Sequence, residues 1–511
     1  MQKDVFDWID GGSGHANIIA VAGSGKTTTL IEGMAHMGGR ITLAAFNKKI
    51  AVEIQNRLSE RNIQGEAATF HSIGFRAWRQ LANRGCRTNT SKIYEIMDEM
   101  NAELGEVIPK TYRVFLNKLV SLARQSLIGV PGYPPIHEDS AWWEIVDHFD
   151  LTDDLPGDPT PDEVVDSAIG MAQQILMRSI DSAPDVIDFD DMLYMPLQQG
   201  ASFPRFNWTL IDEAQDTNAA RREIASRMMG NGRLIAVGDP CQAIYGFTGA
   251  DAEAMNLLAD KIGGVTELPL TVSYRCPQAV VRTAQQWVSH IQSHPDAPEG
   301  ISGHMDFQEF DRLGSEVLNS RAAVLCRNTA PIISLAYRFL RRDIPCKVEG
   351  REIGQGLIRL ISKWRVSSLR TLMDRLEEYT EREAAKFMLA KKHGKVARLY
   401  DQLDTIQAIS AGLAPTATVD DLRAKIQDLF QDTDEGRQRT IVLSTIHKAK
   451  GREWDRVYWY GSDTLQPSRF ASLDWEREQE DNLCYVAATR AKQELIRFPL
   501  NPDEQRSSHS L

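Results

Sequence analysis

The stretch AVAGSGKTTTL, residues 20–30, decides the fold that the sequence predicts. The apolar run NIIAVA that leads into it is typical of a buried strand, and the residues after Gly25 are typical of a helix. In a strand, glycine-rich turn and helix, backbone N–H groups and the helix N-terminus together cradle phosphate. A chance glycine turn is the alternative. The stretch predicts a nucleotide-phosphate site.

The residues of this loop have separate predicted roles. Gly23 and Gly25 let the backbone approach the ligand, and Lys26 reaches the β and γ phosphates of ATP. The hydroxyl of Thr27 is a predicted Mg²⁺ ligand. The general pattern GxxxxGK[ST] has Gly where this chain has Ala20. The predicted nucleotide contacts of the loop are Ala22, Gly23, Ser24, Gly25, Lys26, Thr27 and Thr28.

A second motif supplies the carboxylates that such a loop requires. WTLIDEAQD, residues 208–216, has the pattern of an apolar strand that ends in adjacent acids. Asp212 is predicted to hold Mg²⁺, and Glu213 is predicted to orient and deprotonate the attacking water. Two solvated acids at a strand end are the alternative, but that requires both motifs to arise independently in one chain.

Composition restricts the class of protein. The chain has 511 residues, of which 42% are hydrophobic and 25% charged, as in folded globular proteins. The six cysteines form no CxxC pair, which argues against a zinc ribbon or iron–sulfur cluster. No apolar run approaches the ~20 residues that cross a bilayer, and the first residues lack a signal-peptide pattern, so we expect no membrane partner and a cytoplasmic location. A net charge of -12 requires any nucleic acid to bind a local basic groove.

The order of the motifs resembles that of the UvrD/Rep-like superfamily 1 DNA helicases. FNKKIA followed by TFHSIGFRAW is also similar to the F-box DNA helicase subgroup. The segments that carry the resemblance, besides the glycine loop, are LAAFNKKIA (43–51), ATFHSIG (68–74), LIDEAQD (210–216), VGDPCQAIYGFTGAD (237–251), LTVSYRCP (270–277), VLCRNTA (324–330), STIHKAKGREWD (444–455) and LCYVAATRAK (483–492).

The resemblance implies an α/β fold with two RecA-like P-loop domains, in which parallel sheets are flanked by helices, and with helical insertion domains. It places ATP in the cleft between the two domains. The motifs divide the sequence into an N-terminal motor domain at 1–80 and 188–266 with a 1B-like helical insert at 81–187, and a C-terminal motor domain at 267–364 and 437–511 with a short, reduced 2B-like insert at 365–436.

The implied activity is that of an ATP-dependent DNA helicase or translocase that moves 3′ to 5′ on single-stranded DNA and requires Mg²⁺. The expected partners are single-stranded DNA, junctions of single and double strands, and replication or recombination proteins. One alternative is a DNA-dependent ATPase that strips or remodels nucleoprotein complexes without strand separation. A small-molecule P-loop kinase is a third hypothesis, although it needs neither paired arginines nor aromatic strand contacts.

The resemblance also implies roles for residues outside the two acidic and glycine-rich motifs. Arg275 and Arg490 match the arginines that reach the γ-phosphate from the second domain, and surface ion pairing is their alternative. Gln242 matches the family's coupling glutamine. Gln2 and Tyr274 match residues that recognise adenine, and Glu453 matches an acid near the ribose.

Single-stranded DNA requires a different set of side chains. Tyr245 and Phe247 alternate in AIYGFTG, and the resemblance implies that both stack on bases, since an aromatic face accepts any base. Aromatic residues at alternate positions in a buried core are the alternative. The predicted contacts to the DNA backbone are Asn47, Thr69, His71, Thr445, His447 and Lys450.

Overall fold

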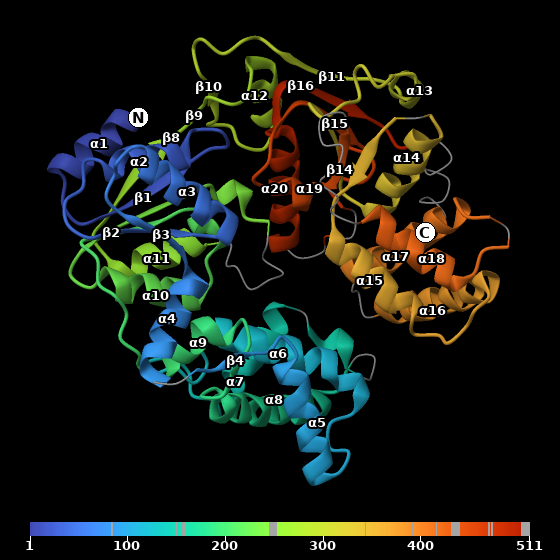
Figure 1. The fold of residues 1–511 in the computed structure, drawn as a ribbon, viewed down its shortest axis with the longest axis horizontal. Helices are drawn as coiled ribbons and strands as arrows, with labels where there is room; N and C mark the ends of the chain where they lie inside the picture. Colours follow the sequence, from blue (N-terminus) through green and yellow to red (C-terminus); the bar gives the residue numbers. More distant parts are fainter. Residues whose placement is uncertain are drawn as a thin grey trace. The chain divides into compact units, whose positions relative to one another are not determined.

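The computed structural model describes the chain except residues 83–84, 150, 156–159, 245–252, 343, 390–392, 415, 431–439, 469–470, 472–473 and 502–511. The chain divides into two compact units, drawn in Figure 1. The first unit contains residues 1–21 and 25–271, and the second contains residues 22–24 and 272–511.

The first unit is built on a parallel six-stranded sheet with the strand order β3-β2-β6-β7-β1-β8. Because neighbouring strands are in register, with Ile211 beside Ala236 and Ile19 beside Gly238, the carboxyl ends of β6, β7 and β1 lie at one edge. The strands are β1 (His15–Ala20), β2 (Ile41–Ala45), β3 (Glu66–Thr69), β6 (Trp208–Ile211), β7 (Arg233–Gly238) and β8 (Val265–Leu270).

Helices pack against this sheet through two separate apolar cores. Side chains alternate along each strand, so Leu43 and Leu210 belong to one core and Ala44 and Ile211 to the other. The first core includes side chains of α1, α2 and α3, and the second includes those of α4, α9, α10 and α11. These helices are α1 (Gln2–Gly11), α2 (Lys26–Met34), α3 (Lys48–Glu60), α4 (Phe70–Ala82), α9 (Asp191–Gln198), α10 (Ala219–Met229) and α11 (Ala254–Ile262).

A helical insert follows α4 and continues the second core of the first unit. Trp142 is fully buried there, and its Nε1 donates to Ile136 O at 2.8 Å. The insert contains α5 (Lys92–Leu104), α6 (Arg113–Gln125), α7 (Asp139–His148) and α8 (Asp162–Ser182), with the paired short strands β4 (Arg87–Thr88) and β5 (Val186–Ile187).

The second unit is built on another parallel six-stranded sheet, with the order β11-β16-β15-β12-β14-β13. The apolar runs AAVLC (322–326), IVLST (441–445) and RVYWY (456–460) all lie in this sheet. The strands are β11 (Ile301–His304), β12 (Ala322–Cys326), β13 (Cys346–Val348), β14 (Ile441–Thr445), β15 (Trp454–Tyr460) and β16 (Ala491–Phe498), and a separate pair is β9 (Val272–Ser273) with β10 (Gln292–Ser293).

The helices of the second unit fall into two groups. One group accompanies the sheet: α12 (Gln278–Ala284), α13 (Phe307–Asp311), α14 (Thr329–Arg341), α15 (Arg351–Ile361), α19 (Ile446–Ala449) and α20 (Asp474–Ala488). The other group is the short insert: α16 (Leu369–Leu389), α17 (His393–Ala411) and α18 (Val419–Leu429). Figure 1 shows the insert beside α14 and α15, and its apolar residues share one core with the sheet.

The two parallel sheets and their helices confirm the predicted α/β class. The boundary after residue 266 differs from the structure, because β8 continues to Leu270 and pairs with β1 along its whole length, which keeps the first unit intact to Thr271. Within the described residues, no helix combines the length and apolar character that a bilayer crossing requires.

Candidate nucleotide and nucleic-acid site

The glycine-rich loop begins where β1 ends and leads directly into α2. Gly23 and Gly25 have φ angles of 72° and 81°, which L side chains rarely adopt. A Cβ atom at Gly23 would also lie 2.5 Å from the Cβ of Arg275. The loop therefore requires glycine at these two positions.

Lys26 opens α2 and directs its side chain back across the loop. Its Nζ donates to the carbonyl oxygens of Ala20 and Val21 at 3.2 and 3.4 Å. It also lies 3.9 Å from Asp239 Oδ2, and both side chains are buried. An ammonium group thus lies at the carboxyl ends of the strands, where a phosphate chain in the loop would meet it.

Thr27 and Asp212 face each other across the same edge. Thr27 Oγ1 donates to Asp212 Oδ2 at 2.9 Å. Burial and the adjacent Glu213 carboxylate raise the pKa of Asp212 to about 6. A hydroxyl and a carboxylate are hard oxygen donors, and a buried carboxyl with a raised pKa gains from a nearby cation. These two residues therefore fit Mg²⁺.

Glu213 has an unusual backbone conformation for a residue with a side chain. Its φ angle is 54°, in the left-handed region, and its N–H donates to Asp212 Oδ1 at 3.0 Å. The Glu213 carboxylate accepts from Gln215 Nε2 at 2.5 Å. Backbone strain of this kind persists where the surroundings enforce it, and it is concentrated at functional sites.

Two residues that the sequence analysis did not select, Gln215 and Asp239, connect the predicted ones. Asp239 Oδ2, near Lys26, accepts from Gln242 Nε2 at 2.5 Å. Asp239 N donates to Gln215 Oε1 at 3.0 Å, and Gln215 in turn donates to Glu213. The available signal was a polar residue just beyond each of two apolar strands: Asp239 directly follows β7, and Gln215 is the fourth residue after β6.

The remaining predicted nucleotide contacts near the glycine-rich loop lie around the start of α2. Gln2 begins α1, and its Nε2 is 3.1 Å from the position that a Cβ atom on Gly25 would occupy. Ser24 is buried, and Thr28 is exposed on the first turn of α2. The amide of Gln2 therefore lies next to the loop, although 23 residues separate it from Gly25 along the chain.

In the second unit, Arg275 and Glu453 form an ion pair. Arg275 Nε donates to Glu453 Oε2 at 2.6 Å, and Arg275 Nη1 donates to Thr489 O at 3.3 Å. Tyr274 is 56% exposed and packs at a tilt on His294, with 4.9 Å between ring centroids. Three residues with predicted nucleotide roles thus lie in neighbouring positions of one unit.

Arg490 is buried in the same unit, and not on its surface. Its side chain is 1% exposed, and its guanidinium donates to Val486 O at 3.0 Å and to Arg452 O at 3.3 Å. Arg490 Nη2 also donates to Thr489 Oγ1 at 3.1 Å. Surface ion pairing, the alternative for this residue, does not fit these contacts.

Residues 22–24 of the glycine-rich loop have their contacts in the second unit. Ala22 N donates to the hydroxyl of Tyr485 at 2.8 Å, and Tyr274 N donates to Gly23 O at 2.8 Å. Tyr485 is fully buried on α20. Tyr485 is not among the predicted site residues, because a tyrosine within an apolar helical stretch is typical of a core residue.

The predicted DNA contacts of the first unit lie after the carboxyl ends of β2 and β3. Asn47 caps α3, since its side chain accepts from Ile50 N at 3.0 Å. Thr69 Oγ1 accepts from Ser72 N at 3.2 Å at the start of α4. Both polar side chains have local structural partners at the surface of the unit.

His71 stacks on Phe189, a residue that the sequence analysis missed. The ring centroids are 3.7 Å apart, the planes are inclined by 21°, and Phe189 is 59% exposed. Burial and the neighbouring Arg221 guanidinium lower the pKa of His71 to about 3. Arg221 lies over the ring of Phe46 at 5.1 Å. The aromatic rings of His71, Phe189 and Phe46 and the guanidinium of Arg221 thus come from four separate segments of the first unit.

The predicted DNA contacts of the second unit lie at the end of β14. Thr445 is the last residue of that strand, and His447 and Lys450 lie in and after α19. Burial lowers the pKa of His447 to about 3, with Arg327 and Lys448 contributing. The two predicted base-stacking residues, Tyr245 and Phe247, lie outside the described residues.

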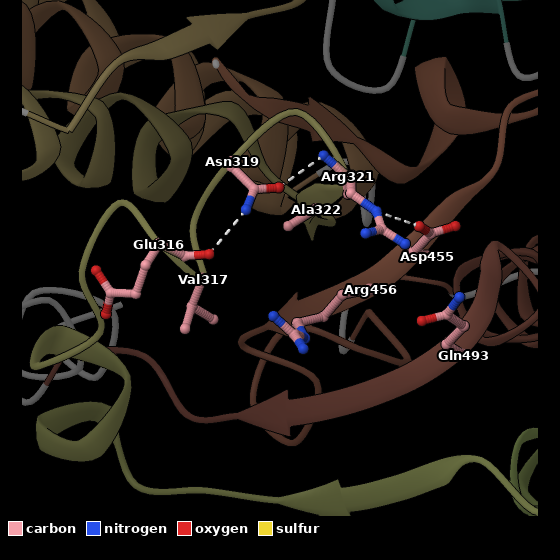
Figure 2. A pocket seen from close by; sticks show the side chains of 8 residues that line it. All are labelled: Glu316, Val317, Asn319, Arg321, Ala322, Asp455, Arg456 and Gln493. Carbon is pink, nitrogen blue, oxygen red and sulfur yellow. Dashed lines mark hydrogen bonds and ion pairs between the residues drawn. The ribbon is translucent and has the colours of Figure 1, made fainter. Parts of the chain in front are cut away.

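A polar pocket of about 180 Å³ lies at the amino ends of β12 and β15 (Figure 2). Arg321 Nε donates to Asp455 Oδ2 at 2.6 Å, and Arg456 forms an ion pair with Glu494. The lining residues are Glu316, Val317, Asn319, Arg321, Ala322, Asp455, Arg456 and Gln493. No predicted site residue is among them.

The glycine loop, the buried Asp212 carboxylate and the two parallel sheets define an α/β P-loop protein. Residues 8–263 match the UvrD/REP helicase N-terminal domain, and residues 360–497 match the UvrD-like helicase C-terminal domain. Since the first match alone spans half of the sequence, the chain belongs to the UvrD/REP helicase family, and its two parallel sheets belong to RecA-like domains.

Individual relatives are similar at modest identity. F-box DNA helicase protein 1 of Schizosaccharomyces pombe is 28% identical over 59% of this chain and 35% of that protein. ATP-dependent DNA helicase Rep of Escherichia coli is 27% identical over 53% and 41%, so the matches span less than half of these two proteins. ATP-dependent DNA helicase UvrD1 of Mycobacterium tuberculosis is 26% identical over 94% and 79%. A crystal structure of arterivirus nonstructural protein 10 (helicase) is 12% identical over 99% of this chain and 63% of that one. Its TM-score of 0.33 is too low to support an argument.

Proposed function

We propose that this protein is an ATP-dependent DNA helicase or translocase that moves 3′ to 5′ on single-stranded DNA. One observation carries the proposal: a continuous set of contacts joins Lys26 to Glu213 through Asp239 and Gln215. The residue that would hold the γ-phosphate is thereby connected to the residue that would activate water. The direction of movement follows from the family.

The first unit supplies the groups for hydrolysis. The loop N–H groups and Lys26 bind the phosphates, and Glu213 accepts the proton of the attacking water. Thr27 and Asp212 would hold Mg²⁺, which would neutralise phosphate charge. Gln242, which donates to Asp239, would respond to the γ-phosphate. Adenine is contacted by Gln2.

The second unit supplies the charge that completes the site. Arg275 and Arg490 stabilise the negative charge that develops on the γ-phosphate, Tyr274 stacks on adenine, and Glu453 lies near the ribose. One triphosphate then contacts both units, and its hydrolysis alternately closes and opens the cleft between them.

The DNA strand is bound by aromatic and polar groups of both units. The exposed ring of Phe189 on His71 offers a flat face for a base, and each such stack contributes ~1–3 kcal/mol. Arg221 lies close enough to His71 to lower its pKa and can pair with phosphate. The other proposed contacts are Asn47, Thr69, Tyr245, Phe247, Thr445, His447 and Lys450. The proposed substrates are single-stranded DNA and its junctions with duplex.

The proposal is tested by comparing ATP hydrolysis and strand separation on duplexes with a 3′ tail, a 5′ tail or blunt ends, at matched concentrations. We expect single strands to stimulate hydrolysis, and only the 3′-tailed duplex to be separated. A rate of ATP hydrolysis that does not change when DNA is added would contradict the assignment as a DNA motor. Separation of the 5′-tailed duplex alone would contradict the direction.

A second candidate is an ATPase that strips proteins from DNA without separating strands. The observation that favours it is the short insert, whose three helices share the core of the second unit. A streptavidin displacement assay on biotinylated single strands distinguishes the two. Displacement without separation of any tailed duplex would favour stripping.

A further inference from the structure

The turn that carries Phe189 is held by buried charges. Asp188 and Asp190 flank Phe189 between β5 and α9, and Asp191 is the first residue of α9. Asp191 is completely buried and Asp188 nearly so, whereas Phe189 is exposed. The carboxylates therefore point into the protein, while the aromatic ring between them faces outward. This is the reverse of the ordinary distribution of charged and apolar side chains.

Arg124 of the helical insert binds all three carboxylates. Its Nη1 lies 2.9 Å from both oxygens of Asp188 and 2.9 Å from Asp191 Oδ1. Its Nη2 lies 3.3 Å from Asp190 Oδ2. The Arg124 side chain is 2% exposed, so it cannot itself reach a DNA phosphate.

Lys92, on another helix of the insert, binds the same turn. Its Nζ donates to Asp191 Oδ2 at 2.6 Å and to Ser179 O at 2.7 Å. Two positive charges from α5 and α6 thus neutralise the buried carboxylates of a segment outside these helices. Buried ion pairs contribute little net stability compared with apolar packing, so a role in fixing conformation is the better explanation.

Helix α6 also reaches the segment that follows the acidic motif. Ser121 Oγ donates to Asp190 Oδ2 at 2.5 Å, and Gln125 Nε2 donates to Ser121 Oγ at 3.2 Å. Gln125 Oε1 accepts from Asn218 Nδ2 at 3.0 Å. Asn218 caps α10, and Arg221 on this helix is the residue beside His71. Helix α6 therefore contacts both the turn that carries Phe189 and the cap of the helix that carries Arg221.

We propose that Arg124 and Lys92 are positioning residues for DNA binding: the helical insert holds the 188–191 turn so that Phe189 stacks on His71 and presents its ring to a base. The inference rests on the proposed function. It assigns the insert a role in shaping a binding surface whose contact residues lie outside the insert helices.

The test uses the full chain and a fluorescent oligothymidylate. We expect Phe189→Ala to weaken binding about fivefold or more, the lower end of one base stack. Arg124→Gln is expected to weaken binding to a similar extent, and the double variant no further than the stronger single variant, because both changes remove the same contact. The rate of ATP hydrolysis without DNA is expected to stay unchanged in Arg124→Gln, whereas the DNA concentration for half-maximal stimulation rises.

Matched variants separate positioning from general damage. Arg178, also in the insert, forms an exposed ion pair with Glu103, and Arg178→Gln is expected to bind DNA normally. If Arg124→Gln does not fold, Ser121→Ala removes a smaller contact to Asp190 and is expected to show the same non-additivity with Phe189→Ala.

The outcomes distinguish this inference from the proposed function. Normal binding by a folded Arg124→Gln variant, or losses that add in the double variant, would overturn the positioning role while leaving the proposed function intact. Normal binding by Phe189→Ala would overturn the platform itself, and with it the role of Arg124. Failure of the wild-type protein to bind any single strand would contradict the proposed function first.

Discussion

Asp239 contacts several of the other polar residues of the candidate nucleotide site. One of its oxygens contacts both Lys26 and Gln242, and its backbone N–H reaches Gln215. A γ-phosphate bound by Lys26 would compete with Asp239 for the same ammonium group. Through this competition, a bound nucleotide would change the contacts of Asp239 and thereby those of Gln242 and Glu213.

His71 is expected to act as a neutral ring. Because burial lowers its pKa to about 3, it stays uncharged from pH 8 to 5.5, and its contribution to DNA affinity should not change over that range. Its unfolded form takes up a proton below about 6.5, so this residue makes stability fall as pH falls below that value. Measured oligothymidylate affinity of wild type and His71→Phe should therefore follow the same pH curve.

His71→Phe is the matched variant, because it keeps a planar ring and removes only the titrating nitrogens. His71→Ala should weaken binding at every pH by removing the support for Phe189. The opposite result would be a wild-type affinity for DNA that rises in acid, with no such rise in His71→Phe. That result would show that the histidine becomes charged on DNA and would contradict the prediction.

The sequence predicts the residues of the site that belong to contiguous motifs, and it misses those that depend on distant contacts. Lys26, Thr27 and Asp212 follow strand ends in recognisable patterns, and the structure brings them together. Phe189 lies in an ordinary acidic stretch, and its exposure depends on Arg124, which is 65 positions away in sequence.

Helix α17 of the short insert anchors a helix of the second motor domain. Asp401 accepts from Thr329 N and Ala330 N at 3.0 Å, so it caps the start of α14 from outside that helix. Burial raises the pKa of Asp401, while these two N–H groups oppose the shift. The insert is therefore joined to the motor domain by polar contacts as well as by the shared core.

Asp401→Ala should weaken this anchor. Loss of a cap costs ~0.5–2 kcal/mol, so we expect the amides at the start of α14 to exchange hydrogen about 2-fold to 30-fold faster. Hydrogen exchange of peptides that include Thr329 and Ala330 measures the change. Asp420→Ala, which removes an exposed ion pair with Arg423, is the control. Equal exchange in the two variants would contradict the anchoring role.

The sequence indicates the strands that have strong apolar patterns, but it does not indicate the edge strand β8. Strands β12 and β14 are buried runs that the sequence reveals directly. Strand β8 is mostly exposed at the edge of the first sheet, and its sequence VTELPL contains a proline. Its membership depends on pairing with β1, which the local pattern does not reveal.

In the whole molecule, the proposed chemistry is divided between two units. The first unit contains Lys26 and Asp212, and the second contains Arg275 and Arg490. A net charge of -12 requires any DNA to be bound by local basic groups, and not by a generally basic surface. Neither unit contains the full set of predicted catalytic residues.

In the proposed function, residues of both units contact the same ATP molecule. Arg275→Ala tests it more directly than a change at Arg490, whose burial makes structural damage difficult to separate from chemistry. Arg321→Ala is the matched control, because Arg321 forms an ion pair of the same 2.6 Å length with Asp455 in the same unit. Lys26→Ala provides the reference for loss of the phosphate site.

The measurement is the DNA-stimulated turnover of ATP together with the affinity for ATP, in wild type, Arg275→Ala and Arg321→Ala. The account predicts that Arg275→Ala lowers turnover about a thousandfold or more while changing ATP affinity far less, because the arginine acts on charge that develops during the reaction. Arg321→Ala is expected to match wild type. Turnover by Arg275→Ala within about twofold of wild type, with hydrolysis still abolished by Lys26→Ala, would contradict the claim that the second unit takes part.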